Sequence, residues 1–432
     1  MKVKRVVLHF GINKTGSTSI QKTLFSNSTV LEKNGFKYLN EWGEHHWDLF
    51  RILFQPHPEV YPNEIKLSKV FVEKNRQRYK KNLCKILTNV INTTESETLI
   101  LSGVYYGSYY LDSAVENLKN FIEEYFTSKG IETRIILFAR NPLTHLISRF
   151  QQKLSPGDLE HGIERFEQIK GGILSYEGIW SLKIKLNESV TVLKFEDAVK
   201  DEDGLVGFFL KAIGFPKEQL RDLKVITANE SRSQESIELI NYIEEKEPIY
   251  PFGKNKPVNI NREKFGNDLI PIMKLEGLKF DLPHEDKLVI WELVKETVNH
   301  LKEHAGVDYT DYKIPPPRQQ ETYSEETIKN FIDVFPKLSP AIQKLFLEYF
   351  EKKYTETGDS KFQKLYSKGS VPWQTHASIS SGGWLIWRIK KMLYVITTHI
   401  KTLIKLFLGR RVARSKVFIR SSYNIKPKQQ GG

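Results

Sequence analysis

Nine residues near the start of the chain combine small side chains, hydroxyls and one lysine in a pattern that suits anion binding. The apolar run at residues 6–10 leads directly into residues 11–19, Gly-Ile-Asn-Lys-Thr-Gly-Ser-Thr-Ser. A strand, such a loop and then a helix from about Ser17 point several backbone N–H groups and a helix N-terminus at one place. The sequence therefore predicts a loop that binds a phosphate or a sulfate.

The order of residues in this loop differs from that of ATPases. A Walker loop has four residues between its first Gly and the Gly-Lys-Ser/Thr, whereas Lys14 follows Gly11 by three residues and precedes Gly16. The order Lys-Thr-Gly-Ser-Thr instead resembles the 5′-phosphosulfate loop of sulfotransferases that use 3′-phosphoadenosine-5′-phosphosulfate (PAPS). A chance Gly/Ser turn and a generic phosphate loop are the alternatives for this loop alone.

A second motif follows another short apolar strand, at residues 134–139. Arg140, Asn141 and Pro142 come next, and Pro142 suits the first turn of a helix because its missing N–H would be unpaired there. Ser148 lies eight residues after Arg140, and a guanidinium with a hydroxyl can converge on one phosphate. Sulfotransferases use this Arg and Ser spacing to hold the 3′-phosphate of PAPS. Taken alone, the pair also fits an arginine that ends a strand and a serine on a solvated helix face.

Weaker similarities continue downstream in the order that the family shows. Residues 190–197 resemble its last parallel strand, residues 207–215 the helix after it, and residues 229–233 the loop that opens the next helix. Tyr176 and Trp180 also fit the pattern, although core packing explains them better. The resemblance covers residues 3–312 and is specific only at the two cofactor motifs.

Short apolar strands alternate with helical stretches through the first half of the chain. This alternation predicts an α/β fold, a central parallel sheet flanked by helices, as in P-loop sulfotransferases, with a helical C-terminal extension. The strands that we expect are residues 6–10, 36–39, 98–102, 134–139 and 190–195. Both cofactor motifs then lie at the carboxyl ends of strands, where such sheets bind ligands.

Breaks in composition divide the rest of the chain. Three prolines at residues 315–317 end the predicted catalytic domain, and Ser324 offers an N-cap to a following helix. We expect a catalytic domain at residues 1–314, a helical extension at 315–366, a linker at 367–383 and a basic amphipathic tail at 384–432.

Net positive charge is concentrated in the part of the chain after Asp359. Of the 65 Lys and Arg residues, 15 lie after Asp359, and none of the 52 Asp and Glu residues does. Apolar residues between Leu385 and Phe407 share one helical face, which suits the surface of an anionic membrane through residues 384–420. Packing on the catalytic domain or on a second subunit is the alternative, and nothing else in the chain resembles a nucleic-acid module.

Several classes of protein are excluded by composition. One cysteine, Cys84, excludes internal disulfides and Cys-rich metal sites, and no cluster of ligands calls for a metal. No stretch has the length of a secretory signal core or of a membrane span. We therefore expect a cytoplasmic protein, peripheral on the inner membrane face if the tail binds lipid.

The resemblance implies roles for the residues of both motifs. Lys14 would face the leaving oxygen and the sulfonate, as a catalytic residue that needs no metal. The cofactor-binding residues that it implies are Lys14, Thr15, Gly16, Ser17, Thr18, Arg140 and Ser148.

Sulfuryl transfer also needs a general base for the acceptor hydroxyl or amine. Relatives use His or Glu early in the sheet, and residues 41–46, Glu-Trp-Gly-Glu-His-His, follow the second predicted strand. His46 and His45 are the candidates, with Glu44 next, although a substrate-binding or an ordinary loop role is also open. Many relatives have an acidic residue soon after the third strand, whereas Ser102 is followed here by Gly-Val-Tyr.

Together these features indicate a PAPS-dependent sulfotransferase with a carbohydrate acceptor, such as a membrane-associated polysaccharide or a glycolipid. The carbohydrate preference depends on the resemblance to polysaccharide-type sulfotransferases. It depends also on aromatic residues near the expected site, which core packing would explain as well: Trp42, Trp47, Tyr105, Tyr106, Tyr109 and Tyr110. The alternatives are a kinase-like nucleotide-binding protein and a catalytically inactive scaffold of the same fold.

Overall fold

A five-stranded parallel sheet forms the centre of the computed structural model, which describes residues 2–55, 73–104, 112–153, 166–228, 231–248, 269–317 and 322–367. The strand order is β2-β3-β1-β4-β5, and every neighbouring pair is parallel. The strands are β1 (Arg5–Gly11), β2 (Phe36–Tyr38), β3 (Thr98–Val104), β4 (Glu132–Ala139) and β5 (Val190–Lys194). All five predicted strands and the predicted fold class are confirmed.

The central strand β1 is apolar on both faces because helices cover both faces of the sheet. One face packs on α1 (Ser17–Ser26), α2 (Ser28–Lys33), α8 (Phe195–Lys200) and α9 (Gly204–Ala212). The other packs on α3 (Trp47–Phe54), α4 (Glu73–Thr93), α5 (Asp112–Tyr125), α7 (Phe166–Leu186) and α13 (His284–Ala305). Val7 belongs to the first core and Val6 to the second, as the alternation of a strand requires.

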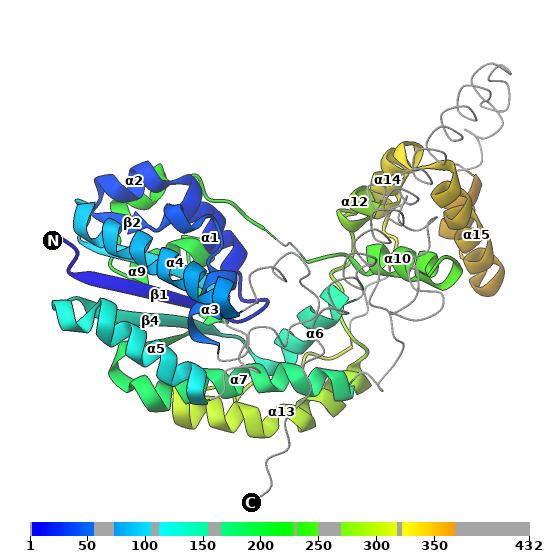
Figure 1. Cartoon of the computed structure of the whole chain (residues 1–432). Coiled ribbons are helices and arrows are strands. Elements are labelled where there is room, and N and C mark those ends of the chain that lie inside the picture. The colour runs from blue at the N-terminus through cyan, green and yellow to red at the C-terminus, as the bar shows by residue number, and fades with distance from the viewer. Residues whose placement is uncertain are drawn as a thin grey trace, which may run out of the picture.

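Helix α6 (Pro142–Lys153) begins at Pro142, as the sequence predicts, and lies beside α7 and α13. In Figure 1, α6 lies between the sheet and a second group of helices. Short 3₁₀ turns cover Asn40–Trp42, Thr127–Lys129, Asn187–Ser189, Lys217–Asp222 and Phe335–Lys337. None of the helices within the described ranges has the length and apolar character needed to cross a membrane.

The second group of helices lies apart from the sheet in Figure 1. It has a hydrophobic core of its own. It contains α10 (Gln234–Lys246), α12 (Leu269–Met273), α14 (Glu325–Val334) and α15 (Pro340–Thr357). Ser324 caps α14 as expected, since its side chain accepts the N–H of Thr327.

The second core contains residues from both sides of the predicted boundary between residues 314 and 315. Ile240 and Ile272 pack in one cluster with Phe346. Helix α13 lies between the two halves in sequence but packs on the sheet side, through Val298 and Leu301. The linker at 367–383 and the tail at 384–432 lie outside the described residues, apart from Ser367.

Candidate active site

The loop predicted to bind an oxyanion connects β1 to α1 at the carboxyl edge of the sheet. Lys14 and Gly16 both have left-handed backbone conformations, with φ of 66° and 75°. The Thr15 hydroxyl is buried and donates to the carbonyl of Ile12 at 2.7 Å, which closes the loop on itself. The first N–H groups of α1 are unpaired within the helix and face this turn.

Both glycines of the loop are required by close packing. A Cβ on Gly11 would lie 1.7 Å from Ser17 Oγ, and a Cβ on Gly16 would lie 1.9 Å from Leu205 Cδ2. Leu205 is in the first turn of α9, so the loop rests on the helices that follow β5. A Cβ at either glycine would therefore meet a neighbouring side chain, and Gly16 has in addition a left-handed backbone that favours glycine.

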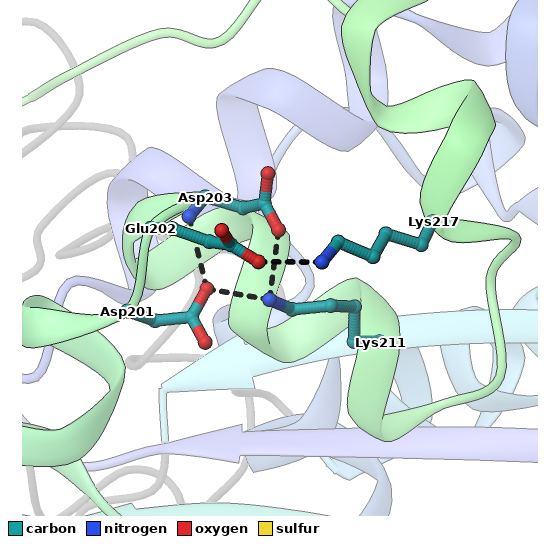
Figure 2. Close-up of polar contacts among 5 residues, drawn as sticks. All are labelled: Asp201, Glu202, Asp203, Lys211 and Lys217. Atoms are coloured by element: carbon teal, nitrogen blue, oxygen red, sulfur yellow. Dashed lines mark hydrogen bonds and ion pairs between the residues drawn. The ribbon is translucent and has the colours of Figure 1, made fainter.

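The turn that carries Leu205 is fixed by a lysine (Figure 2). Lys211 Nζ contacts Asp201 Oδ1 at 2.6 Å and Asp203 Oδ2 at 2.7 Å, and the backbone N–H of Asp203 donates to Asp201 Oδ1 at 3.0 Å. These contacts join the end of α8 to the start of α9. They hold Leu205 against the loop.

Three cationic side chains converge on the loop. Arg140 follows the end of β4, and its Nη1 donates to the carbonyl of Lys14 at 2.9 Å while its Nε donates to Thr144 Oγ1 at 3.2 Å. Burial lowers the pKa of Lys14, and the positive charges of Arg140 and Arg232 lower it further. No ion pair to Lys14 is found within the described ranges. Such a cluster is matched by a multiply charged anion.

Arg232 is a site residue that the sequence reasoning did not assign. It lies just before α10, with burial lowering its pKa, and its backbone carbonyl accepts Gln151 Nε2 of α6 at 2.7 Å. The only sign of it in the sequence is an arginine in the polar segment 229–233, where a new helix opens. Its spatial link to Lys14 depends on α6 and could not be read from the chain.

Buried donors near the loop lack hydrogen-bond partners. Among the described residues these include the hydroxyl of Ser17, Nη1 of Arg232 and Nδ2 of Asn141. Buried polar groups are ordinarily paired, so donors left open beside a cationic loop fit an anionic ligand that accepts from them. The residues present therefore fit a phosphate or a sulfate group.

The backbone around Arg140 is held by three side chains, of which Tyr176 and Tyr309 are buried and Glu196 is half-buried. Tyr176 Oη donates to the carbonyl of Arg140 at 2.8 Å, and Glu196 Oε1 accepts the N–H of Asn141 at 3.0 Å. Tyr309 Oη in turn donates to Glu196 Oε2 at 2.7 Å. Burial raises the pKa of both tyrosines, which keeps them as neutral donors. Tyr176 is thus a packing residue that also fixes the strand end.

Helix α6 also contacts the loop through His145. This histidine is fully buried, burial lowers its pKa well below the usual range, and its Nε2 donates to the carbonyl of Asn13 at 2.9 Å. Ser148 is one turn further along α6 and is 9% exposed. The structure shows no hydrogen bond between Ser148 and Arg140, whose guanidinium is directed to the loop.

His46 is placed differently from the expectation of a catalytic base. Its ring is fully buried, burial lowers its pKa to about 3, and backbone groups engage both nitrogens. Nδ1 accepts the N–H of Ser102 at 3.0 Å, while Nε2 lies 3.1 Å from the carbonyl of Leu39 and 3.2 Å from that of Gly43. This arrangement fits a structural role that ties the segment after β2 to β3.

His45 is exposed and lies close to α1. Its Nδ1 is 2.8 Å from Gln21 Oε1, and its Nε2 is 2.7 Å from Glu44 Oε1. Trp42 is buried and packs edge-on against His46, so it belongs to the core. The side chain of Trp47 and residues Tyr105, Tyr106, Tyr109 and Tyr110 lie outside what the structure describes.

No protein-family model matches the chain, and no curated protein matches it. Solved structures similar to it include the crystal structure of a sulfotransferase from Alicyclobacillus acidocaldarius, at 15% identity and a TM-score of 0.32, over 57% of this chain and 93% of that one. A sulfotransferase domain from the curacin biosynthetic pathway is similar at 11% identity and a TM-score of 0.30, over 66% of this chain and 100% of that one. Similarity at this level does not identify a ligand, so the ligand is inferred from the residues and geometry of the site itself.

Proposed function

We propose that this protein is a PAPS-dependent sulfotransferase. The observation that supports the proposal best is the convergence of Lys14, Arg140 and Arg232 at the loop, with unpaired buried donors beside them. The 5′-phosphosulfate and the 3′-phosphate of PAPS are two separate anionic groups, which together would use all three of these cations. An ordinary nucleotide diphosphate would leave part of the cluster unmatched.

The residues present divide the work of binding and of charge stabilisation. The loop N–H groups and the open Ser17 hydroxyl would hold the 5′-phosphate, and Arg140 and Arg232 the 3′-phosphate. PAPS supplies a sulfuryl group on a good leaving phosphate. Lys14 would stabilise the negative charge that grows on the leaving oxygen as the acceptor oxygen attacks in line.

Ser148 stays a candidate for the 3′-phosphate site. The Ser148 hydroxyl would bind the ligand from its own position on α6, because no hydrogen bond joins Ser148 to Arg140. Thr18, in the first turn of α1, is partly exposed and available to a ligand. Thr15 is committed to the carbonyl of Ile12 and contributes through its N–H.

The test is calorimetric titration with 3′-phosphoadenosine 5′-phosphate (PAP) and with ADP. Charged hydrogen bonds contribute about 1.5–3 kcal/mol, so PAP should bind roughly 10- to 100-fold more tightly than ADP. Arg140→Ala and Arg232→Ala should each remove that preference. Arg134→Ala is the matched control, because Arg134 is on the same strand but pairs with Glu132 at the surface. Equal or absent binding of the two nucleotides by the wild type would overturn the proposal.

A carbohydrate acceptor at a membrane surface completes the proposal. The polysaccharide-type resemblance of the loop and the basic amphipathic segment at 384–420 support it. Labelled sulfuryl transfer from PAPS should be screened with polysaccharides and glycolipids. The full chain should sediment with anionic vesicles and not with neutral ones. Equal sedimentation by a chain that ends at residue 367 would rule out a membrane role for the tail.

A further inference from the structure

The segment that carries Arg232 pairs with the chain between α12 and α13. Arg232 comes just before α10, which in Figure 1 lies on the side of the second group of helices that faces α6. The carbonyl of Arg232 accepts the side chain of Gln151 at 2.7 Å and the N–H of Phe280 at 3.3 Å. Ser233 forms an antiparallel bridge with Lys279. The backbone position of Arg232 therefore depends on the segment at residues 278–280.

Glu235 holds that segment from inside the second core. Its side chain is completely buried in the first turn of α10. Glu235 Oε1 accepts the N–H of Leu278 at 3.3 Å and the N–H of Tyr323 at 2.9 Å. One carboxylate oxygen thus joins three stretches of chain that are distant in sequence. They are the start of α10, the segment that pairs with Arg232, and the residues that lead into α14.

Tyr323 has a conformation that presents its N–H to Glu235. Its backbone is left-handed, with φ of 56°, which is unfavourable for a residue with a side chain. Its ring is completely buried and packs edge-on against Phe350 and Phe362. Strained residues persist only where their surroundings over-determine them. The contact between Tyr323 and Glu235 is therefore fixed by the core around α15.

Gly277 lies against the other oxygen of the same carboxylate. A Cβ added to Gly277 would be 2.3 Å from Glu235 Oε2 and 2.7 Å from Glu235 Cδ. The backbone of Gly277 is not left-handed, so the close approach to Glu235 is the reason for a glycine here. Glu235 Oε2 has no hydrogen-bond partner among the described residues. Glu235 therefore acts through Oε1.

We propose that Glu235 is a positioning residue for Arg232, through which residues 322–367 set the preference of the site for a nucleotide with a 3′-phosphate. The inference rests on the proposed binding of PAPS, in which Arg232 is a cation of the 3′-phosphate site. Nη1 of Arg232 is buried and lacks a partner, so its direction depends on where the backbone at residue 232 is held. The link runs from Tyr323 through Glu235 and Leu278 to the segment paired with Arg232. Loss of Glu235 Oε1 would release two N–H groups and weaken that pairing.

The test compares the affinities of the full chain for PAP and for ADP, by calorimetric titration, in variants of Glu235. ADP has no 3′-phosphate, so a displaced Arg232 lowers the affinity for PAP and leaves that for ADP unchanged. Glu235→Ala should lower the preference for PAP by about tenfold, the lower end of what a charged hydrogen bond contributes. Glu235→Gln keeps an oxygen that accepts both N–H groups, so it should keep the preference.

Tyr349→Phe is the matched control. Tyr349 Oη of α15 donates to Glu238 Oε2 of α10 at 3.0 Å, a hydrogen bond beside the same core that does not involve the backbone of residues 232–235. This variant should melt at a lower temperature and yet bind PAP and ADP like the wild type. The inference is overturned if Glu235→Ala keeps the wild-type preference, or if Tyr349→Phe loses as much of the preference as Glu235→Ala does.

Gly277→Ala tests the same link if Glu235→Ala does not fold. The new methyl group would displace the carboxylate of Glu235 without removing it, so the preference for PAP should fall a few-fold while the affinity for ADP is unchanged. A wild-type preference in Gly277→Ala would also overturn the inference. Equal binding of the two nucleotides by the wild type would instead contradict the sulfotransferase proposal.

Discussion

Lys14 is placed where its own charge destabilises the protein in the absence of an anion. Burial and two neighbouring arginines lower its pKa, so the folded state binds its proton less firmly than the unfolded chain does. The cost is fully present below the lowered pKa, and it is relieved as pH rises from there toward the ordinary value of a lysine. Charged groups whose pKa is shifted by burial and by neighbouring charges are typical of functional sites.

Lys14→Met should therefore lower the activity of the protein and raise the stability of its nucleotide-free form. We expect sulfuryl transfer to fall on the order of 100-fold or more, since a group that stabilises developing charge is lost. The melting temperature of the nucleotide-free protein should rise by about 2 °C at pH 7, and this gain should shrink toward pH 10. Thermal melts at both pH values check it, with Lys33→Met at the exposed end of α2 as the control. A lower melting temperature for Lys14→Met at pH 7 would contradict the electrostatic account.

Gly16 combines a left-handed backbone with close packing, and the two effects can be separated. Gly130 has a similar φ of 70°, but a Cβ added there would meet no atom within 4 Å. Gly130→Ala should cost about 1 kcal/mol from its conformation alone. Gly16→Ala should cost more, because the new methyl group would collide with Leu205, and it should weaken PAP binding. Urea unfolding compares the two, and Leu205→Ala should rescue Gly16→Ala in part. Equal losses at both glycines would rule out the packing role.

At the scale of elements, the turn between α8 and α9 packs against the loop at residues 11–19. Lys211 joins Asp201 to Asp203 (Figure 2). Leu205, which follows in the first turn of α9, lies beside Gly16. Helix α6 also holds the loop, because His145 Nε2 donates to the carbonyl of Asn13. Gln151 Nε2 of the same helix donates to the carbonyl of Arg232. The loop is thus held by elements that follow β4 and β5 in the sequence.

Lys211→Met should loosen the packing of Leu205 against the loop, although Lys211 itself is not one of the proposed ligand-binding residues. We expect a lower melting temperature and PAP binding weakened a few-fold, because Leu205 would no longer be fixed against the loop. Lys217→Met is the control, since Lys217 forms an exposed pair with Glu202 in the same region, and exposed pairs contribute little. Differential scanning fluorimetry with and without PAP reads both effects. Identical behaviour of the two variants would show that the turn does not need Lys211.

At the scale of the whole molecule, the helices after residue 322 complete a core that begins before the proline break. Phe331, Phe346 and Phe350 are almost fully buried against α10 and α12. Burial of one such side chain is worth about 1.5–3 kcal/mol. The second group of helices therefore shares one core, although α13 interrupts it in the sequence.

A chain that ends at residue 317 should lose this core. We expect exposed apolar surface on α10 and α12, dye binding, and poor solubility, since Ile240 and Ile272 would lose their partners. A chain that ends at residue 367 keeps the whole core and should melt in one transition with PAP affinity intact. Circular dichroism melts and dye fluorescence on both truncations check this. A well-folded shorter chain would indicate that residues 322–367 form an appendage.

The sequence by itself determined the sheet and the loop. Residues 6–10 and their four counterparts are short, largely apolar runs that alternate with helical stretches, which is typical of a parallel sheet, and their bounds agree with the structure within two residues. The order of Gly11, Lys14 and Gly16 is a local pattern on adjacent residues, so it is visible in the chain. Pro142 and Ser324 were also predictable, because helix starts depend on neighbouring residues alone.

Only the tertiary structure decided which side chains share the site. Arg232 influences Lys14 electrostatically although the two residues are more than 200 positions apart in the chain, and α6 links the loop to the start of α10. His45 and His46 are adjacent and chemically identical in sequence, yet one ring is buried between backbone groups and the other meets Gln21 and Glu44. Burial and long-range partners set the chemistry of a side chain, and neither is encoded at the residue itself.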